Sequence, residues 1–402
     1  MKILIVAPYP PSRIRIRLHG FVNHLARQHD VTVLALCSSK REIQDAQAAQ
    51  NQGFTLLMVY DRRLLKMLRT VCALFTRLPL QVAFDASPRL RAVLAQQLAE
   101  GYFDLVHVEF IRALGVVPAD IAIPVVWDAV DCISELYEQG GRSGTTVLLR
   151  WLGLFEARRV RGYERFQVAR FQRVLVTSAR DHEALLRIAS ASCDSMTRLQ
   201  IAQKITVLPH GIDQEDLQPA HLTRLTDTLI FSGKMSFHAN IAAVLLLIEQ
   251  IMPLIWRKRP GTRLVVAGSN PPSRVRRLAR DTRIEVTGYV TDLKPYIEQA
   301  TVAVCPVPYA AGLQNKILEA MALGTPVVAS PQAAAGLRVC TGSDLLVGAD
   351  PQEFATAVLR ILNDPPLQLE LSTRGRAYVA THHDWTQIIQ KLTGIYEEAL
   401  LR

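Results

Sequence analysis

Short runs rich in valine, isoleucine and leucine alternate with helical patterns along the sequence, and this alternation limits the possible folds more than any other feature. Helical patterns such as 18–28 and 88–100 separate the first series of runs. These strand-like runs lie at 2–7, 31–36, 105–108, 125–128, 174–177 and 205–208. Buried strands that alternate with helices form parallel sheets with helices on both faces. The sequence therefore predicts the α/β class.

A second series follows, after polar residues around Pro219 interrupt the pattern. Its strand-like runs lie at 228–231, 263–267, 284–287, 302–306, 326–329 and 344–347, with helical patterns between them. We therefore expect two doubly wound Rossmann-like domains at 1–213 and 227–383, a linker at 214–226 and a final helix at 384–402. Such sheets bind ligands at the carboxyl ends of their strands, here facing an interdomain cleft.

Composition excludes several classes of protein. The 402 residues are 49% hydrophobic and 20% charged, as in an ordinary globular protein. The six cysteines have no CxxC spacing, so neither a zinc site nor a redox pair is indicated. The net charge of +10 is spread over both halves, which argues against a nucleic-acid-binding patch. The longest apolar run, 241–248, is too short to span a membrane, so we expect a cytoplasmic protein.

The most specific segment is 311–330, which reads AGLQNKILEAMALGTPVVAS. It resembles the signature of the family-4 retaining glycosyltransferases, which have the two-domain GT-B fold. A glycine-containing loop before a helix exposes backbone N–H groups that attract phosphate. The resemblance implies that Glu319, within that helix, accepts hydrogen bonds from the ribose of a nucleotide-diphosphate sugar. A solvated helix glutamate is the alternative.

One position departs from the family pattern. Ala311 stands where the family usually has a second glutamate that contacts the donor sugar. The resemblance leaves the backbone of Gly312, Leu313 and Gln314 to hold the sugar and phosphate. The variant resembles a subgroup of bacterial sugar transferases associated with exopolysaccharide systems, in which an Asn-Lys pair is part of the pattern. This pair is Asn315 and Lys316, and the lysine would neutralise diphosphate charge.

Two other segments of the second half match the family. The resemblance places Lys234, directly after Gly233, on the donor diphosphate. It places Tyr289 and Val290 at the nucleobase, where an aromatic ring would stack. A strand-end cation and a packed tyrosine are the alternatives.

The first half offers anion ligands and carboxylates. Arg15 and Arg17 follow the first strand, and we predict that they bind donor phosphate or a charged acceptor. Glu109 and Asp128 end two later strands, and a carboxylate near the acceptor hydroxyl would suit a catalytic or sugar-binding role. Among these residues no acidic metal cluster is evident, so we predict no metal requirement and no cofactor. Gly211, in a turn that resembles another family motif, permits a positive φ at that turn.

The resemblance implies a glycosyltransferase that transfers a sugar with retention to a glycan or lipid-linked acceptor. It also implies that the final helix crosses back to the first domain. A catalytically inactive nucleotide-sugar-binding protein remains an alternative, as does a nucleotide-sugar 2-epimerase. The stretches 62–77 and 150–173 combine arginines with apolar residues at helical spacing, so we predict peripheral binding to an anionic membrane face. Core helices whose arginines face water are the alternative.

Overall fold

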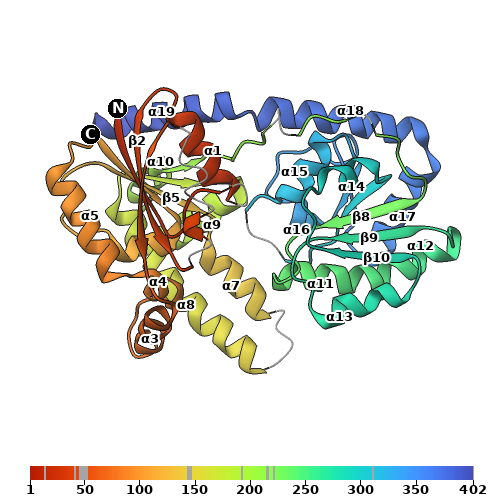
Figure 1. Cartoon of the computed structure of the whole chain (residues 1–402), viewed down its shortest axis with the longest axis horizontal. Coiled ribbons are helices and arrows are strands. Elements are labelled where there is room, and N and C mark those ends of the chain that lie inside the picture. Colours follow the sequence, from red (N-terminus) through yellow and green to blue (C-terminus); the bar gives the residue numbers. More distant parts are fainter. Residues whose placement is uncertain are drawn as a thin grey trace. The chain divides into compact units, whose positions relative to one another are not determined.

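The chain folds into two compact units, each built around its own parallel sheet (Figure 1). The computed structural model describes residues 1–12, 15–39, 42–44, 53–142, 147–191, 193–213, 217–220, 222–309 and 312–401. The first unit comprises Met1–Gly211 and Trp385–Arg402, and the second comprises Ile212–Asp384. The α/β class and the two doubly wound sheets predicted from the sequence are confirmed.

The sheet of the first unit has the order β3-β2-β1-β4-β5-β6-β7, and all its strand pairs are parallel. Most of its strand residues are buried, which explains the continuous apolar runs. The edge strand β3, with its mixed exposure, was not predicted. The strands are β1 (Lys2–Ala7), β2 (Asp30–Cys37), β3 (Thr55–Tyr60), β4 (Leu105–Glu109), β5 (Val125–Val130), β6 (Arg173–Val176) and β7 (Ile205–Val207).

Helices cover both faces of this sheet (Figure 1). The start of α5 shows why local sequence fixes an element: the Ser87 side chain accepts a hydrogen bond from the Leu90 N–H, and Pro88 occupies the first turn. The helices are α1 (Ile16–Leu25), α3 (Arg63–Ala73), α4 (Leu80–Asp85), α5 (Pro88–Glu100), α6 (Phe110–Ala113), η1 (Leu114–Val116), α7 (Ile133–Arg142), α8 (Val147–Arg170), α9 (Ala179–Ala189), α10 (Ser195–Lys204) and α19 (Trp385–Leu400).

The C-terminal helix α19 packs into the core of the first unit through Trp385, which is 5% exposed. Two glycines make room for this indole. A Cβ atom on Gly20 would lie 1.9 Å from the ring, and one on Gly211 would lie 2.4 Å from it. Gly211 permits a positive φ but does not use it, because it is not among the positive-φ glycines. Close approach of an aromatic ring, rather than backbone conformation, requires glycine there.

The sheet of the second unit has the order β10-β9-β8-β11-β12-β13, again with parallel pairs. Its strands are β8 (Thr228–Ser232), β9 (Arg263–Ala267), β10 (Ile284–Gly288), β11 (Val302–Cys305), β12 (Val327–Ala329) and β13 (Leu346–Val347). Its helices are α11 (His238–Leu246), η2 (Leu247–Ile251), α12 (Met252–Lys258), α13 (Ser273–Arg276), η3 (Arg277–Arg280), α14 (Lys294–Gln299), α15 (Asn315–Ala322), α16 (Pro331–Ala334), α17 (Pro351–Asn363) and α18 (Pro365–His382).

One continuous helix of the second unit, His238–Lys258, is long and apolar enough to cross a membrane by length and composition. Half of its most apolar window is buried inside the structure. Val244, Leu247 and Ile255 on this helix are fully buried in the hydrophobic core around the second sheet. Its apolar character is therefore accounted for by packing within the unit.

Candidate functional site

The second sheet reverses its strand order at β8, which lies between β9 and β11. Loops that leave the carboxyl ends of two strands at such a point diverge and leave a crevice for a ligand. The loop after β8 carries Gly233 and Lys234, and the segment after β11 leads to Gly312 and helix α15. The residues predicted on these two loops thus share one edge of one sheet.

Lys316 joins these two loops. Its Nζ donates a hydrogen bond to Asn240 Oδ1 at 2.6 Å, and Asn240 Nδ2 donates to the backbone oxygen of Lys234 at 3.0 Å. The ammonium also lies 4.2 Å from the centre of the Phe231 ring. Burial lowers the pKa of Lys316. The structure therefore brings Lys316 and the Gly233-Lys234 loop together, and Asn240, which sequence reasoning missed, links them.

The backbone at this point needs glycine. Gly233 has a φ of +148°, and a Cβ there would lie 2.8 Å from Asn240 Nδ2 and 3.1 Å from Lys316 Nζ. Gly268, at the end of β9, has a φ of +147°, and its Cβ would lie 1.8 Å from the Gly233 carbonyl oxygen. Both positions exclude a side chain, so the backbone stays accessible next to the Lys316 ammonium.

Helix α15 begins at this edge without a side-chain cap, since Gln314 at its N-cap makes no such hydrogen bond. Gly312, with a φ of +61°, turns the chain just before the helix. Leu313 and Gln314 are partly buried, and Asn315 Oδ1 is buried without a hydrogen-bond partner in the part of the chain that the structure describes. An uncapped helix start with free N–H groups is an anion site. Ala311 lies outside the described residues.

Glu319 lies three residues after Lys316 on α15, so both side chains occupy one face of the helix. Burial raises the pKa of Glu319 to about 7, and the nearby Lys316 ammonium opposes that rise. Among the described residues none donates a hydrogen bond to its carboxylate. A desolvated carboxylate without a partner is ready to accept hydrogen bonds from ligand hydroxyls.

His238 and Tyr309 form a second pair that sequence reasoning missed. Their rings stack with centroids 5.4 Å apart, and His238 Nδ1 lies 2.7 Å from the Tyr309 hydroxyl. Burial lowers the pKa of His238. His238 begins α11 beyond the Lys234 loop, and Tyr309 follows β11. The two residues are far apart in the sequence, so no local pattern predicts their pairing. The strand order of the sheet brings them together.

Tyr289 and Val290 follow β10, the edge strand of the same sheet. Tyr289 is 75% exposed, so it is available for stacking rather than packed into the unit. Because β9 separates β10 from β8, these residues lie about two strand spacings, roughly 10 Å, from the Lys234 loop. No contact between them and the Lys316 cluster is present among the described residues.

The first sheet has its own reversal at β1, between β2 and β4. Here Arg17 is buried and pairs with Asp128 through two contacts, Nε to Oδ2 at 2.6 Å and Nη2 to Oδ1 at 3.0 Å. Its third nitrogen, Nη1, donates to the Leu208 carbonyl at 2.8 Å. The guanidinium predicted to bind phosphate thus neutralises the predicted catalytic carboxylate. The geometry favours a positioning role for Arg17.

Arg15, in contrast, is exposed at the start of α1. Its guanidinium lies 4.0 Å from the centre of the Tyr9 ring. The Tyr9 hydroxyl in turn donates to Glu109 Oε1 at 3.4 Å. Of the two predicted arginines, Arg15 is therefore the one that remains available to an anion. Tyr9 connects it to Glu109.

Glu109 and Asp128 meet around His107. His107 Nε2 lies 3.7 Å from Glu109 Oε2 and 3.7 Å from Asp128 Oδ2. Its other nitrogen, Nδ1, is 2.8 Å from the Tyr396 hydroxyl of α19. Burial, more than any other cause, raises the pKa of Glu109, and neighbouring Asp128 adds to the rise. Sequence reasoning missed Tyr396, because nothing in the α19 pattern marks it as a partner of β4.

Strained backbone accompanies these carboxylates. Phe110, directly after Glu109, has a φ of +64°, and Val130, at the end of β5, has a φ of +66°. A positive φ is costly for any residue with a Cβ, and most costly for a β-branched one. Such strain persists only where the surrounding structure enforces it, and it clusters at functional sites. This supports Glu109 and Asp128 as members of a site.

His107, Glu109 and Asp128 offer ligand atoms that all lie within 4.8 Å of one another, a grouping that the sequence analysis did not recognise. His107 Nε2 and Glu109 Oε2 are buried without hydrogen-bond partners among the described residues. Arg17, however, already contacts both oxygens of Asp128. A cation would face this guanidinium, so the donor set does not fit a metal ion.

Comparison with known proteins identifies the second unit. Residues 226–364 match the family model described as glycosyl transferases group 1. A GDP-mannose-dependent monoacylated alpha-(1-6)-phosphatidylinositol monomannoside mannosyltransferase of Corynebacterium glutamicum is 28% identical over 158 residues, which are 36% of this chain and 42% of that protein. An MMP alpha-(1->4)-mannosyltransferase of Mycolicibacterium hassiacum is 27% identical over 236 residues, 56% of each chain. The chain thus matches about half the length of these relatives.

Solved structures match the whole chain. Anabaena HepE in complex with UDP aligns with a TM-score of 0.69 at 14% identity, covering 99% of this chain and 100% of that one. WaaG, a glycosyltransferase involved in lipopolysaccharide biosynthesis, aligns with a TM-score of 0.65 at 14% identity, covering 98% and 99%. At this identity the likeness establishes the fold, which is the GT-B fold.

Proposed function

We propose that this chain, a GT-B protein whose residues 226–364 match the group 1 glycosyltransferases, transfers a sugar from a nucleotide-diphosphate sugar to an acceptor. The observation that carries the proposal is the cluster of Lys316, Asn240 and the Lys234 loop at the strand reversal of the second sheet. Cations, glycine backbone and an uncapped helix start converge there, which is the chemistry that a diphosphate requires.

In this proposal the second unit binds the donor. Lys234 and Lys316 neutralise the diphosphate, the backbone of Gly312, Leu313 and Gln314 contacts phosphate and sugar, and Glu319 accepts hydrogen bonds from the ribose. Tyr289 stacks on the base, while the Val290 backbone contacts its edge. Negative charge develops on the leaving diphosphate in the transition state, so the two ammonium groups assist its departure. The reaction as proposed uses no metal ion or cofactor.

The first unit contributes the acceptor side of the reaction in this proposal. Arg15 meets a phosphate of the donor or a charged acceptor. The buried His107, Glu109 and Asp128 group orients a sugar hydroxyl and receives its proton. His107 Nε2 and Glu109 Oε2 lie 3.7 Å apart, and neither atom has a hydrogen-bond partner among the described residues. We propose retention of the anomeric configuration, which the family signature at 311–330 supports.

The donor is expected to be a UDP-sugar or a GDP-sugar. One relative is named as GDP-mannose-dependent, and Anabaena HepE was solved with UDP and with UDP-glucose. A thermal-shift screen over UDP, GDP, ADP and their sugars distinguishes these, because a ligand that binds the folded protein raises its unfolding temperature. If none of these nucleotides shifts the transition, the proposal fails.

Turnover is tested by incubating the protein, the donor selected by that screen and a bacterial lipid extract, with mass spectrometry of the products. A glycosylated product whose anomeric proton shows the donor's configuration supports the retaining transferase. Donor binding with no turnover on any acceptor would favour an inactive binding protein. Conversion of the donor into its epimer without acceptor would favour an epimerase.

We further propose that the acceptor is a glycan or a lipid-linked glycan and that the protein works at the cytoplasmic face of a membrane. The named substrate of the Corynebacterium relative is a phosphatidylinositol mannoside, and WaaG acts in lipopolysaccharide biosynthesis, which supports an acceptor on a lipid. The exposed apolar side chains of α3 and α8, next to arginines, support an interfacial location. An exopolysaccharide pathway is part of this proposal.

A further inference from the structure

Helix α3 in the first unit buries a lysine and exposes its large apolar side chains. Its buried residues are Lys66 and Ala73, whereas its large apolar side chains face outward. Leu64 is 68% exposed, Val71 is 55% exposed and Phe75, just beyond the helix, is 89% exposed. A helix of a globular unit normally buries its apolar face, so this orientation has to be held in place.

Ion pairs on the inner face hold it. Lys66 Nζ lies 2.9 Å from Asp85 Oδ1, and both side chains are 1% exposed. Asp85 also pairs with Arg112, while Arg69 pairs with Asp61. Breaking a buried pair leaves an uncompensated buried charge, so the helix cannot roll its apolar face inward without a large loss of stability.

The far end of α3 is tied to α8. The Arg159 guanidinium donates hydrogen bonds to the backbone oxygens of Ala73, Thr76 and Leu78. The two basic stretches that the sequence analysis singled out therefore lie against each other in one unit. Arg77, Arg158 and Phe166 line a second pocket, of about 530 Å³, where they meet.

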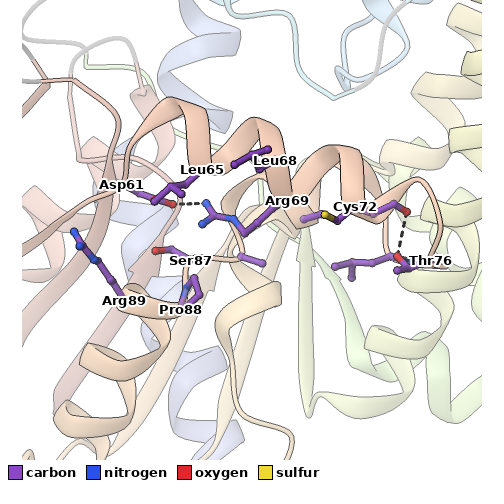
Figure 2. A pocket seen from close by; sticks show the side chains of 13 residues that line it. Asp61, Leu65, Leu68, Arg69, Cys72, Thr76, Ser87, Pro88 and Arg89 are labelled. Carbon is purple, nitrogen blue, oxygen red and sulfur yellow. Dashed lines mark hydrogen bonds and ion pairs between the residues drawn. The ribbon is translucent and has the colours of Figure 1, made fainter.

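A pocket of about 570 Å³ opens under α3 (Figure 2). Leu65, Leu68 and Cys72 of α3 form one wall, and the start of α5 at Ser87 and Pro88 forms the opposite wall. The Arg69–Asp61 ion pair also lines the pocket, and these two charges neutralise each other. Pockets of this size take small ligands, and apolar walls select an apolar one.

Between Arg62 and Ala99 every exposed charged side chain is positive. Arg62, Arg63, Arg77 and Arg89 are exposed, and Arg89 also lines the pocket. From Arg62 to Ala99 the sequence holds one acid, Asp85, which is buried. An apolar pocket with Arg89 in its lining and further arginines exposed nearby in the sequence matches an anionic headgroup that carries a hydrocarbon chain.

We propose that this pocket takes one acyl chain of an anionic membrane phospholipid, with the headgroup phosphate held by Arg89, which lines the pocket. The proposal rests on the membrane location proposed above and adds a specific lipid site to it. The exposed apolar side chains of α3 then lie among the acyl chains of neighbouring lipids. Bound lipid would fix the first unit on the bilayer at one defined point, beyond general attraction to charge.

The probe is dioctanoyl phosphatidylglycerol below its micelle-forming concentration, titrated by calorimetry. Wild-type protein should bind it, and Cys72→Trp, which fills the pocket from α3, should weaken binding at least tenfold. Ala86→Phe fills the same pocket from the opposite side and should act alike. Cys193→Trp, at another exposed cysteine of the first unit outside this pocket, is the matched control and should bind as wild type.

Two outcomes would overturn the lipid site. The first is lipid binding that is unchanged in both pocket variants, or competition by glycerol 3-phosphate as strong as that by the full lipid. Either result would show that no acyl chain enters the pocket. A wild-type dimer that Cys72→Trp dissociates, without lipid binding, would assign this face to a second copy of the chain. Nucleotide thermal shifts, measured on the same samples, report the glycosyltransferase proposal separately, because the pocket variants leave the second unit unchanged.

Discussion

At the scale of single residues, Glu319 is the side chain whose removal should affect donor binding most directly. An unpaired ribose hydroxyl in the bound state costs roughly 1–3 kcal/mol. Glu319→Ala should therefore raise the dissociation constant of the nucleotide-sugar about tenfold or more in calorimetry. Glu370→Ala, an exposed change on α18, is the matched control and should have no effect. An unchanged dissociation constant in Glu319→Ala removes this residue from the site.

The raised pKa of Glu319, about 7, gives this site a pH signature. The carboxylate that accepts ribose hydroxyls becomes protonated as the pH falls through 7, so donor affinity should drop, by roughly tenfold per pH unit below the pKa. The nucleotide-sugar diphosphate does not titrate in this range. Calorimetry at pH 8 and pH 6 checks this, and Glu319→Gln should remove the difference. A pH dependence that persists in this variant would assign it to another group.

The same pKa makes a prediction about stability. The pKa of the Glu319 carboxyl in the folded protein lies above its ordinary value in the unfolded chain. As the pH rises, the unfolded chain therefore loses this proton first, and the free energy of unfolding falls between the two pKa values. Glu319→Gln should therefore raise the melting temperature more at pH 8 than at pH 5. Calorimetric scans of both proteins at the two pH values test this. An equal difference at both values would show that Glu319 titrates normally.

Lys234 should act on the leaving diphosphate rather than on binding alone. An interaction that strengthens as charge develops lowers kcat when it is removed, in addition to affinity. Lys234→Ala should lower both in a steady-state assay with the selected donor. Lys258→Ala, at the end of α12, is a control at another helix-terminal lysine. A variant whose melting temperature changes while both kinetic constants stay constant would make Lys234 structural.

At the scale of secondary-structure elements, the packing of α19 depends on Gly211. A Cβ there would lie 2.4 Å from Trp385, so Gly211→Ala should displace the indole. Overpacking of this kind costs roughly 1–3 kcal/mol, measurable by urea unfolding. Gly162→Ala in α8, where a Cβ meets nothing within 4 Å, should be neutral or stabilising. Equal stability of Gly211→Ala and wild type would contradict this account.

Local patterns predicted the elements well, because buried parallel strands and capped helices have strong signals. The segment 88–100 was predicted with the bounds that α5 has, since Ser87 and Pro88 mark its start. Strand β3 was missed, because an edge strand with mixed exposure lacks a continuous apolar run. Site residues were predicted where a motif supplies them, as at Glu319 and Lys316, which the structure places on one face of α15. In the second unit, long-range contacts bring Asn240 to Lys316 and Tyr309 to His238, and in the first unit they bring Tyr396 to His107; no local pattern encodes these contacts.

At the scale of the whole molecule, binding to anionic membranes should depend on salt and on the exposed arginines. Each cation near such a surface contributes about 1 kcal/mol. Wild-type protein should sediment with phosphatidylglycerol vesicles at low salt, and replacing Arg62, Arg63 and Arg77 with Ser should abolish this. Lys66 and Arg69 are unsuitable for this test, because their buried ion pairs anchor α3. Wild-type protein that stays in the supernatant at low salt would favour a soluble acceptor.

The return of α19 to the first unit has a consequence for how this protein is made. Residues 1–211 leave the ribosome well before Trp385 and Tyr396, which fill the core behind α1 and complete the contacts of His107. Until then the nascent first unit has an open apolar slot at Gly20 and Gly211, where the indole belongs. A chain that stops short of Trp385 therefore carries the site carboxylates Glu109 and Asp128 but lacks a finished scaffold for them. The packing around His107 is therefore completed only after α19 has been translated.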